Sequence, residues 1–153
     1  MLSRLFPRRV DNRFVGHRAA LWLLGLYVAL KLVMSVNAIF NTRMVAAGDG
    51  LALDRFGAEA GRTVLMLFAL MALGQLMIAL LALAALIRWR ALVPFAYLLL
   101  IAEHGLRRII VGGHAVAGAE ATTAAIALNY GLLALLAAGL LLSLLGAGRG
   151  EVA

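Results

Sequence analysis

Three polar residues stand inside otherwise apolar stretches of this chain: Lys31, Gln75 and Glu103. Each lies about 13 residues, equivalent to about 20 Å of helix, from the arginine flanking its stretch, so three membrane helices would bring them to one depth. Lys31 is too deep to reach either interface comfortably and needs an acid, and Glu103 is the acid within the apolar stretches. We predict a buried Lys31–Glu103 ion pair, with Gln75 and Ser35 as hydrogen-bonding neighbours.

This pair has two interpretations. A structural pair locks helix packing, whereas a functional pair marks a ligand-binding or proton-linked site, since charges within membranes tend to lie on functional paths. The sequence leaves both open. We expect Glu103 and Arg107, four residues apart on one helix, to interact as well.

Further polar groups follow Glu103 toward the predicted outer surface. His104 can relay a proton near neutral pH, contact an anionic headgroup, or serve as a hydrogen-bonded packing residue. Arg107 and Arg108 suit a phosphate or carboxylate headgroup, and they can equally anchor the helix at that surface. Asn37 and Asn129, near the outer ends of their helices, would complete a polar vestibule or be solvated at the interface.

No catalytic residue, metal site or cofactor is predicted. The absence of cysteine excludes thiol nucleophiles and thiolate metal sites. His104 and His114 lie at one end of one predicted helix, so they do not bracket a haem from opposite sides. A metal site from His104, His114 and Glu120 matches no ligand spacing. An enzyme is therefore the less favoured class.

The composition indicates a chain that uses lipid as its solvent. Of 153 residues, 65% are hydrophobic and 14% are charged, and whole stretches are apolar on every helical face. The net charge of +7 comes largely from arginines flanking apolar runs, which fits membrane topology and argues against nucleic acid as a partner.

Four segments have the length of about 20 residues that a spanning helix needs. We predict an all-α, polytopic membrane protein, a four-transmembrane-helix antiparallel bundle with spans at about 19–40, 63–87, 91–111 and 121–145. A basic tail, 1–18, precedes this domain, and a short tail, 146–153, follows it. Arginines in the tails and at Arg88 and Arg90 outnumber those of the first outer loop, and Trp22 and Trp89 suit the same interface. Both termini are therefore expected in the cytoplasm, at a bacterial inner membrane.

Two other segments bear on partners. The first outer loop, 41–62, contains the turn signal Asp49-Gly50 and is expected to cover the mouth of the bundle. The last predicted helix carries a stripe of small residues that allows close approach, either within the bundle or between protomers. This small-residue stripe consists of Ala124, Ala127, Gly131, Ala134 and Ala138.

In helix number and size the chain resembles the small four-helix DoxX-like membrane proteins and, more loosely, the small multidrug transporters. Those transporters carry an essential glutamate in the first helix, whereas here the first helix carries Lys31 and the membrane acid is Glu103 in the third. No functional residue is transferred from either family.

The favoured hypothesis is a module that binds a lipid or other amphipathic ligand in its polar layer, or that docks on a larger membrane complex. The second is a small transporter that works as a homo-oligomer and loads protons on Glu103. The third is a membrane enzyme using His104 and Glu103 as acid and base.

Overall fold

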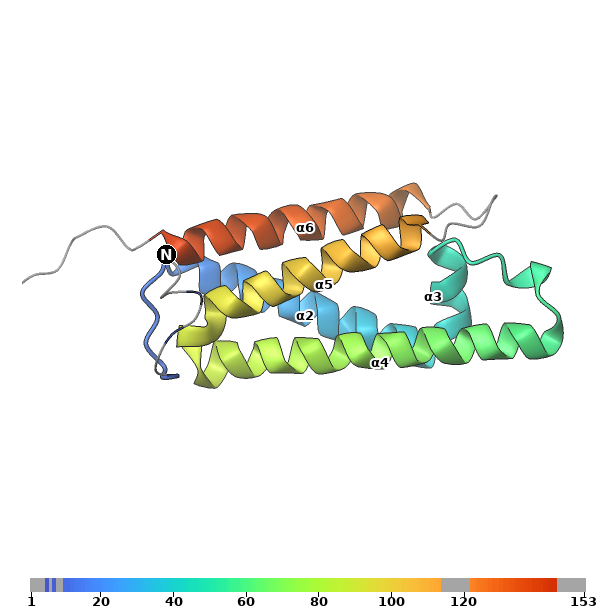
Figure 1. Ribbon diagram of the computed structural model, residues 1–153, viewed down its shortest axis with the longest axis horizontal. Helices are drawn as coiled ribbons and strands as arrows, with labels where there is room; N and C mark the ends of the chain where they lie inside the picture. The colour runs from blue at the N-terminus through green and yellow to red at the C-terminus, as the bar shows by residue number, and fades with distance from the viewer. Residues whose placement is uncertain (1–4, 6, 8–9, 114–121, 146–153) are drawn as a thin grey trace, which may run out of the picture.

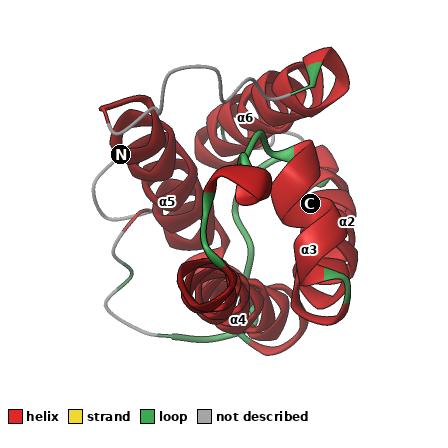
Figure 2. Cartoon of the chain, turned by 90° about the vertical axis from the view of Figure 1, so that its right-hand side faces the viewer, coloured by secondary structure: helices red, strands yellow, loops and turns green. Residues whose placement is uncertain are grey.

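The computed structural model describes residues 5, 7, 10–113 and 122–145, and these form helices without any β-strand. Two short 3-10 turns connect the helices. The helices are α2 (Ala19–Phe40), α3 (Thr42–Gly48), α4 (Ala58–Arg88), α5 (Val93–Gly113) and α6 (Thr123–Leu144). Helices α2, α4, α5 and α6 run alongside one another, while α3 lies across one end (Figures 1 and 2).

Helices α2, α4 and α6 are long and apolar enough to cross a membrane, which indicates an integral membrane protein. Helix α5 has 21 residues but does not meet the same criterion, because Glu103, Arg107 and Arg108 interrupt its second half. Three spanning helices are thus supported within the described part of the chain, and the crossing of α5 remains a prediction.

Helix α4 begins at Ala58 rather than near Thr63 and has 31 residues, a length of about 46 Å against about 30 Å for a hydrocarbon core. Its last turn leads into the turn Arg90–Leu92 and then into α5, with Pro94 in the first turn, where its missing N–H costs little. The two helices are antiparallel and close together at this turn, and α5 then diverges from α4 toward α6 (Figure 1). We call this end of the bundle the hairpin end and the opposite one the α3 end.

The chain before α2 is fixed to the hairpin end by main-chain contacts. His17 N donates to Leu142 O at 3.0 Å, and Ala91 N donates to Asp11 O at 3.2 Å. These bonds bring the segment before α2, the start of α5 and the last turn of α6 together at one end of the molecule.

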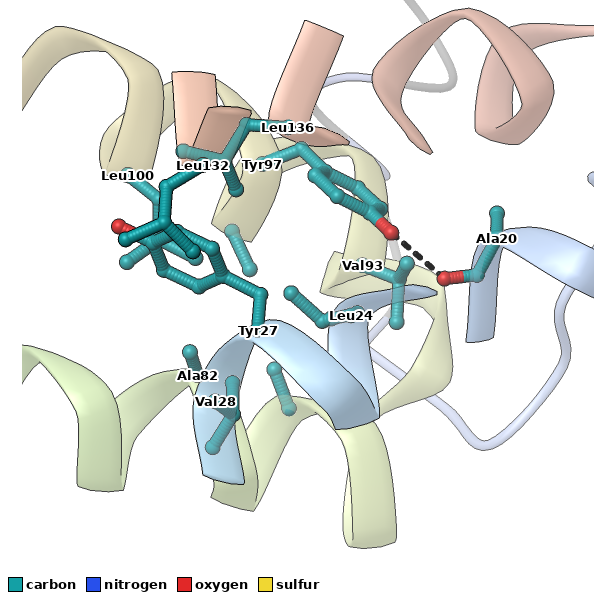
Figure 3. Close-up of a cluster of buried hydrophobic side chains, with 12 residues drawn as sticks. Ala20, Leu24, Tyr27, Val28, Ala82, Val93, Tyr97, Leu100, Leu132 and Leu136 are labelled. Carbon is teal, nitrogen blue, oxygen red and sulfur yellow. Dashed lines mark hydrogen bonds between the residues drawn. The ribbon is translucent and has the colours of Figure 1, made fainter. Parts of the chain in front are cut away.

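The hydrophobic core is concentrated toward the hairpin end, where all four long helices contribute to it (Figure 3). Helix α4 presents only alanines among its fully buried residues, so it packs closely on α2. The larger buried side chains come from α2, α5 and α6: Leu24, Tyr27, Val28, Tyr97, Leu100 and Leu136.

Tyr97 links three helices within this core. Its hydroxyl donates a 2.6 Å hydrogen bond to Ala20 O of α2, and the bond is buried (Figure 3). Its ring lies against Gly139 of α6 so closely that a Cβ atom on Gly139 would overlap it. Gly139 is therefore required by packing.

The first outer loop contains more structure than its sequence predicts. Asn41 caps the end of α2, and α3 begins at Thr42. The side-chain hydroxyl of Thr42 donates a hydrogen bond to Ile39 O at 2.8 Å. The chain then turns at Asp49-Gly50, where Gly50 has a φ of 90°, a conformation suited to glycine. In the view along the bundle axis in Figure 2, α3 lies in front of α2 at this end.

The small-residue stripe of α6 does not mediate packing within the bundle. All of its members are exposed, whereas α6 buries Leu132, Leu136, Gly139 and Ser143. The stripe remains open to lipid or to another protein. Residues 1–4, 6, 8–9, 114–121 and 146–153 lie outside the described part of the chain. They include most of the start of the predicted basic tail, the whole predicted tail 146–153, and His114 and Glu120.

We expect Gly139→Ala to lower the free energy of unfolding by about 1–3 kcal/mol, because the added methyl group overlaps the Tyr97 ring. Gly131→Ala on the same helix is the control, since no atom lies within 4 Å of its added Cβ. It should be neutral or stabilising by up to about 1 kcal/mol through helix propensity. Thermal unfolding in one detergent measures both, and equal stabilities would contradict the close contact.

Candidate functional site

A polar cavity of about 140 Å³ lies between the helices on the α3 side of the core. Every helix from α2 to α6 contributes to its wall, together with the turn after α3. Its polar lining comprises Tyr27, Lys31, Ser35, Asn37, Asp49, Gln75, His104, Arg107 and Asn129. Its apolar lining comprises Met34, Ala38, Val45, Phe68, Met71, Ala72 and Leu132.

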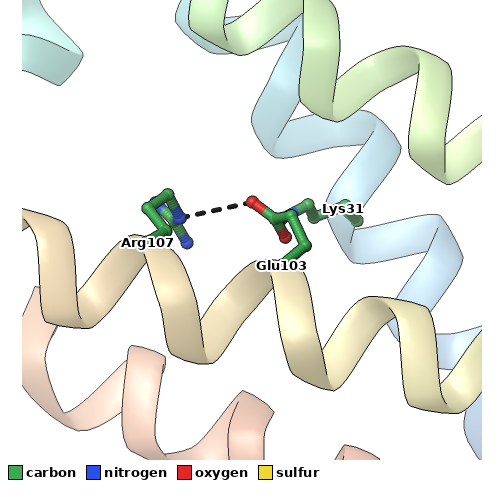
Figure 4. Close-up of polar contacts among 3 residues, drawn as sticks. All are labelled: Lys31, Glu103 and Arg107. Atoms are coloured by element: carbon green, nitrogen blue, oxygen red, sulfur yellow. Dashed lines mark hydrogen bonds and ion pairs between the residues drawn. The ribbon is translucent and has the colours of Figure 1, made fainter.

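Lys31 of the cavity wall forms an ion pair with Glu103, which is not itself part of the lining. Lys31 Nζ lies 2.9 Å from Glu103 Oε2, and the two side chains are 4% and 16% exposed (Figure 4). The pair joins α2 to α5 across the bundle. A lysine buried to this degree without an acid would leave an uncompensated charge, so the contact is a requirement of the fold.

Arg107 engages the second oxygen of the same carboxylate. Its Nε lies 3.5 Å from Glu103 Oε1, one helical turn away on α5 (Figure 4). Glu103 therefore lies between two cations, one on each oxygen. Arg107 is 24% exposed, so it extends from the buried pair toward the open side of the site.

Several polar atoms in the cavity wall have no hydrogen-bond partner. They are the Tyr27 hydroxyl, Ser35 Oγ, both ring nitrogens of His104 and Arg107 Nε, which is close to Glu103 but poorly aligned for a hydrogen bond. The main chain of Asn129 lies near the His104 ring, yet neither nitrogen reaches a described group with hydrogen-bond geometry. Buried groups of this kind usually have partners.

The amide side chains of the predicted site take different roles. Asn37 Oδ1 accepts from Asn41 Nδ2 at 2.7 Å, and Asn129 Nδ2 donates to Ala125 O at 2.7 Å. Asn37 and Asn129 both line the cavity, and Gln75 of α4 lines it as well. The structure thus brings Asn37, Gln75 and Asn129 into one site with Lys31 and Arg107.

Arg108 is separated from the other predicted residues. It is not part of the cavity wall, and its guanidinium carbon lies 5.3 Å from the ring centroid of Tyr130 on α6. This cation–π contact fixes Arg108 between α5 and α6. Adjacent arginines on a helix point about 100° apart, which explains why Arg107 reaches the cavity and Arg108 does not.

Asp49 and Tyr27 belong to the site although sequence reasoning did not select them. Asp49 was interpreted only as part of a turn, but it lines the cavity at the α3 end. The residue is exposed as a whole, but partial burial of its carboxylate raises the pKa of that group, while Arg107 and Arg108 act in the opposite direction. Tyr27 precedes Lys31 by one helical turn, a spacing that could have identified it.

A second, larger cavity of about 240 Å³ lies at the hairpin end, with Asp11, Arg13, Arg90 and Pro94 in its wall. Its polar groups are largely satisfied or exposed: Asp11 Oδ1 accepts from Arg13 N at 3.0 Å, and none of the buried unpartnered atoms belongs to it. Its size alone does not indicate function. The smaller cavity is the stronger site because buried polar atoms gather there.

No protein-family model matches the chain, and no curated protein or solved structure matches it. The site must therefore be interpreted from its own chemistry. Within the described residues, no three His, Asp or Glu side chains gather in a way that would hold a metal ion.

A double-mutant cycle measures the link between Lys31 and Glu103. Lys31→Met or Glu103→Gln alone should cost about 3–5 kcal/mol of stability, because each leaves the partner's charge buried and unpaired. The double variant should cost clearly less than the sum of the two. The readout is chemical or thermal unfolding in detergent.

The control cycle combines Glu103→Gln with Arg88→Met, since Arg88 is exposed in the last turn of α4 at the hairpin end. These effects should be additive, as expected for distant sites. Additivity in the Lys31–Glu103 cycle as well would show that the two charges do not stabilise one another.

Proposed function

We propose that the chain is a membrane-embedded binding module that receives the polar end of an amphipathic ligand in the cavity between α2, α4, α5 and α6. One observation carries this proposal. Within the described residues, every buried side-chain nitrogen or oxygen that lacks a hydrogen-bond partner belongs to a residue lining this one cavity. A randomly imperfect core would scatter such groups.

The energetic cost of these groups supports a ligand. Each buried polar atom left without a partner costs about 1–3 kcal/mol, and four residues at this site carry such atoms. The fold retains them although apolar residues would pack without that cost. A bound molecule with several polar atoms would satisfy them together.

The size of the cavity favours an amphipathic molecule. A volume of about 140 Å³ is below the range of about 300–1,000 Å³ that encloses a whole drug-sized ligand. Only a polar end fits inside, so the remainder of the ligand lies outside. Apolar side chains of α2 and α4, Met34, Phe68 and Met71, border the cavity and suit an apolar chain there.

The orientation of the protein in the membrane follows from the arginines and tryptophans at the hairpin end. Trp22 is 82% exposed at the start of α2, and Trp89 is 42% exposed after α4. Amphipathic rings of this kind favour a membrane interface, and the adjacent arginines favour its cytoplasmic side. We place both termini there, at a bacterial inner membrane, with the polar cavity facing the outer leaflet.

A larger assembly is compatible with this function. The small-residue stripe of α6 is exposed and would allow a second copy or another membrane protein to approach closely. The transporter and enzyme alternatives receive less support. Both oxygens of Glu103 already contact cations, Lys31 and Arg107. The carboxylate is therefore better suited to join α2 and α5 than to carry protons or act as a catalytic base.

Filling the cavity tests the function. Ala38→Leu adds apolar volume at a position that lines the cavity and is 8% exposed. We expect the variant to lose a lipid-like molecule that co-purifies with the wild type, because the side chain occupies the space of its polar end. Native mass spectrometry of protein extracted in native lipid discs measures the retained molecule.

Val36→Leu is the matched control, since Val36 lies two residues away on α2 and is 42% exposed. It should retain the molecule at the wild-type level. A wild type that retains nothing, or an Ala38→Leu variant that retains as much as the wild type, would contradict binding in the cavity.

A further inference from the structure

We propose that the polar end received by this cavity is an oxyanion, a carboxylate or a phosphate group, bound directly by Arg107. This inference rests on the proposed function and specifies the chemistry of its ligand. It also separates two arginines that the sequence leaves equivalent, assigning Arg107 to the ligand and Arg108 to the structure.

Each of the four residues with an unpartnered atom in the cavity wall can donate a hydrogen bond. Tyr27 and Ser35 each offer a hydroxyl, a neutral His104 ring offers one N–H beside one acceptor nitrogen, and the guanidinium of Arg107, whose Nε is the unpartnered atom, offers only donors. Three of these residues are 2% exposed or less: Tyr27, Ser35 and His104. A carboxylate or phosphate presents several acceptor lone pairs and matches such a set of donors better than an alcohol or amine does.

Arg107 is the residue best suited to contact the anion. Its single polar contact with a described residue runs through Nε to Glu103, so its two terminal nitrogens keep their donors. Two parallel N–H groups are the geometry with which arginine binds carboxylate and phosphate bidentately. The 3.5 Å ion pair between Nε and Glu103 keeps the guanidinium in the cavity wall before a ligand arrives.

The charges of the cavity wall leave Arg107 to attract an anion. Lys31 is matched by Glu103 at 2.9 Å, and Arg108 lies outside the cavity wall against Tyr130. The remaining charges in the wall are those of Arg107 and Asp49, and Asp49 is exposed at the α3 end, where water and salt screen its charge. Arg107 is 24% exposed, so its attraction for an anion is screened less.

Two sources can supply this chemistry: a lipid whose headgroup carries the anion, or a small free anion such as inorganic phosphate. The experiment titrates the full-length protein in dodecyl maltoside micelles with monododecyl phosphate, dodecanoate, dodecanol and inorganic phosphate. The readout is the shift of the unfolding temperature and the dissociation constant derived from it.

For the wild type we expect monododecyl phosphate and dodecanoate to bind at least about tenfold more tightly than dodecanol, because an alcohol lacks the charge that Arg107 recognises. Tight binding of the dodecyl anions with weak binding of inorganic phosphate identifies a lipid source. If inorganic phosphate binds as tightly as the dodecyl anions, the ligand is a small free anion, and an apolar chain contributes nothing to its binding.

Three variants locate the contact. Arg107→Gln should weaken binding of the anions by about tenfold or more while leaving dodecanol unchanged, because one bidentate charged contact is lost. Asp49→Asn removes a negative charge from the cavity wall and should tighten anion binding. Arg88→Gln changes an exposed arginine at the hairpin end and should have no effect. Asp49→Asn keeps the test valid if Arg107→Gln fails to fold.

The possible results separate this inference from the function on which it rests. Equal affinity for dodecanol and the anions, or an Asp49→Asn variant that binds anions more weakly, would overturn the oxyanion while leaving an amphipathic ligand. Absence of binding for every dodecyl compound would overturn both.

Discussion

The burial of Lys31 is the constraint on which the rest of this structure depends. A lysine that is 4% exposed in the middle of an apolar helix requires an acid close by, and α5 supplies it through Glu103. At the other end of the core, Tyr97 donates to Ala20, so two polar contacts join α2 and α5. These contacts fix the height of α5 relative to α2, which apolar packing alone would leave free to slide.

The same arrangement creates the cavity. Between the hairpin end and Lys31, alanines of α4 and the close approach of Gly139 to Tyr97 allow dense packing. Beyond Lys31 the wall becomes polar, and large donors such as Tyr27, His104 and Arg107 leave space among them. Dense packing on one side thus holds an incompletely satisfied polar layer on the other, which is the arrangement that a binding site needs.

In the proposed site, ligand binding depends on the same charges that hold the bundle together. Glu103 both neutralises Lys31 and positions Arg107, so one carboxylate serves the fold and the site. A structural pair and a functional pair are therefore not exclusive interpretations here. The Lys31–Glu103 pair serves packing, and under our proposal the charge of Arg107, which contacts the same carboxylate, serves the ligand.

The sequence by itself indicated the four long helices, the apolar character of the chain and a common level for Lys31, Gln75 and Glu103, because the helical rise is constant. It did not predict the short helix α3. It did not determine how each helix is rotated about its axis, since helices that are apolar on every face carry little information about which face packs. The tertiary structure decided that rotation. It turned Arg107 toward the cavity and Arg108 toward Tyr130, exposed the small-residue stripe of α6, and brought Asp49 from a distant turn into the site.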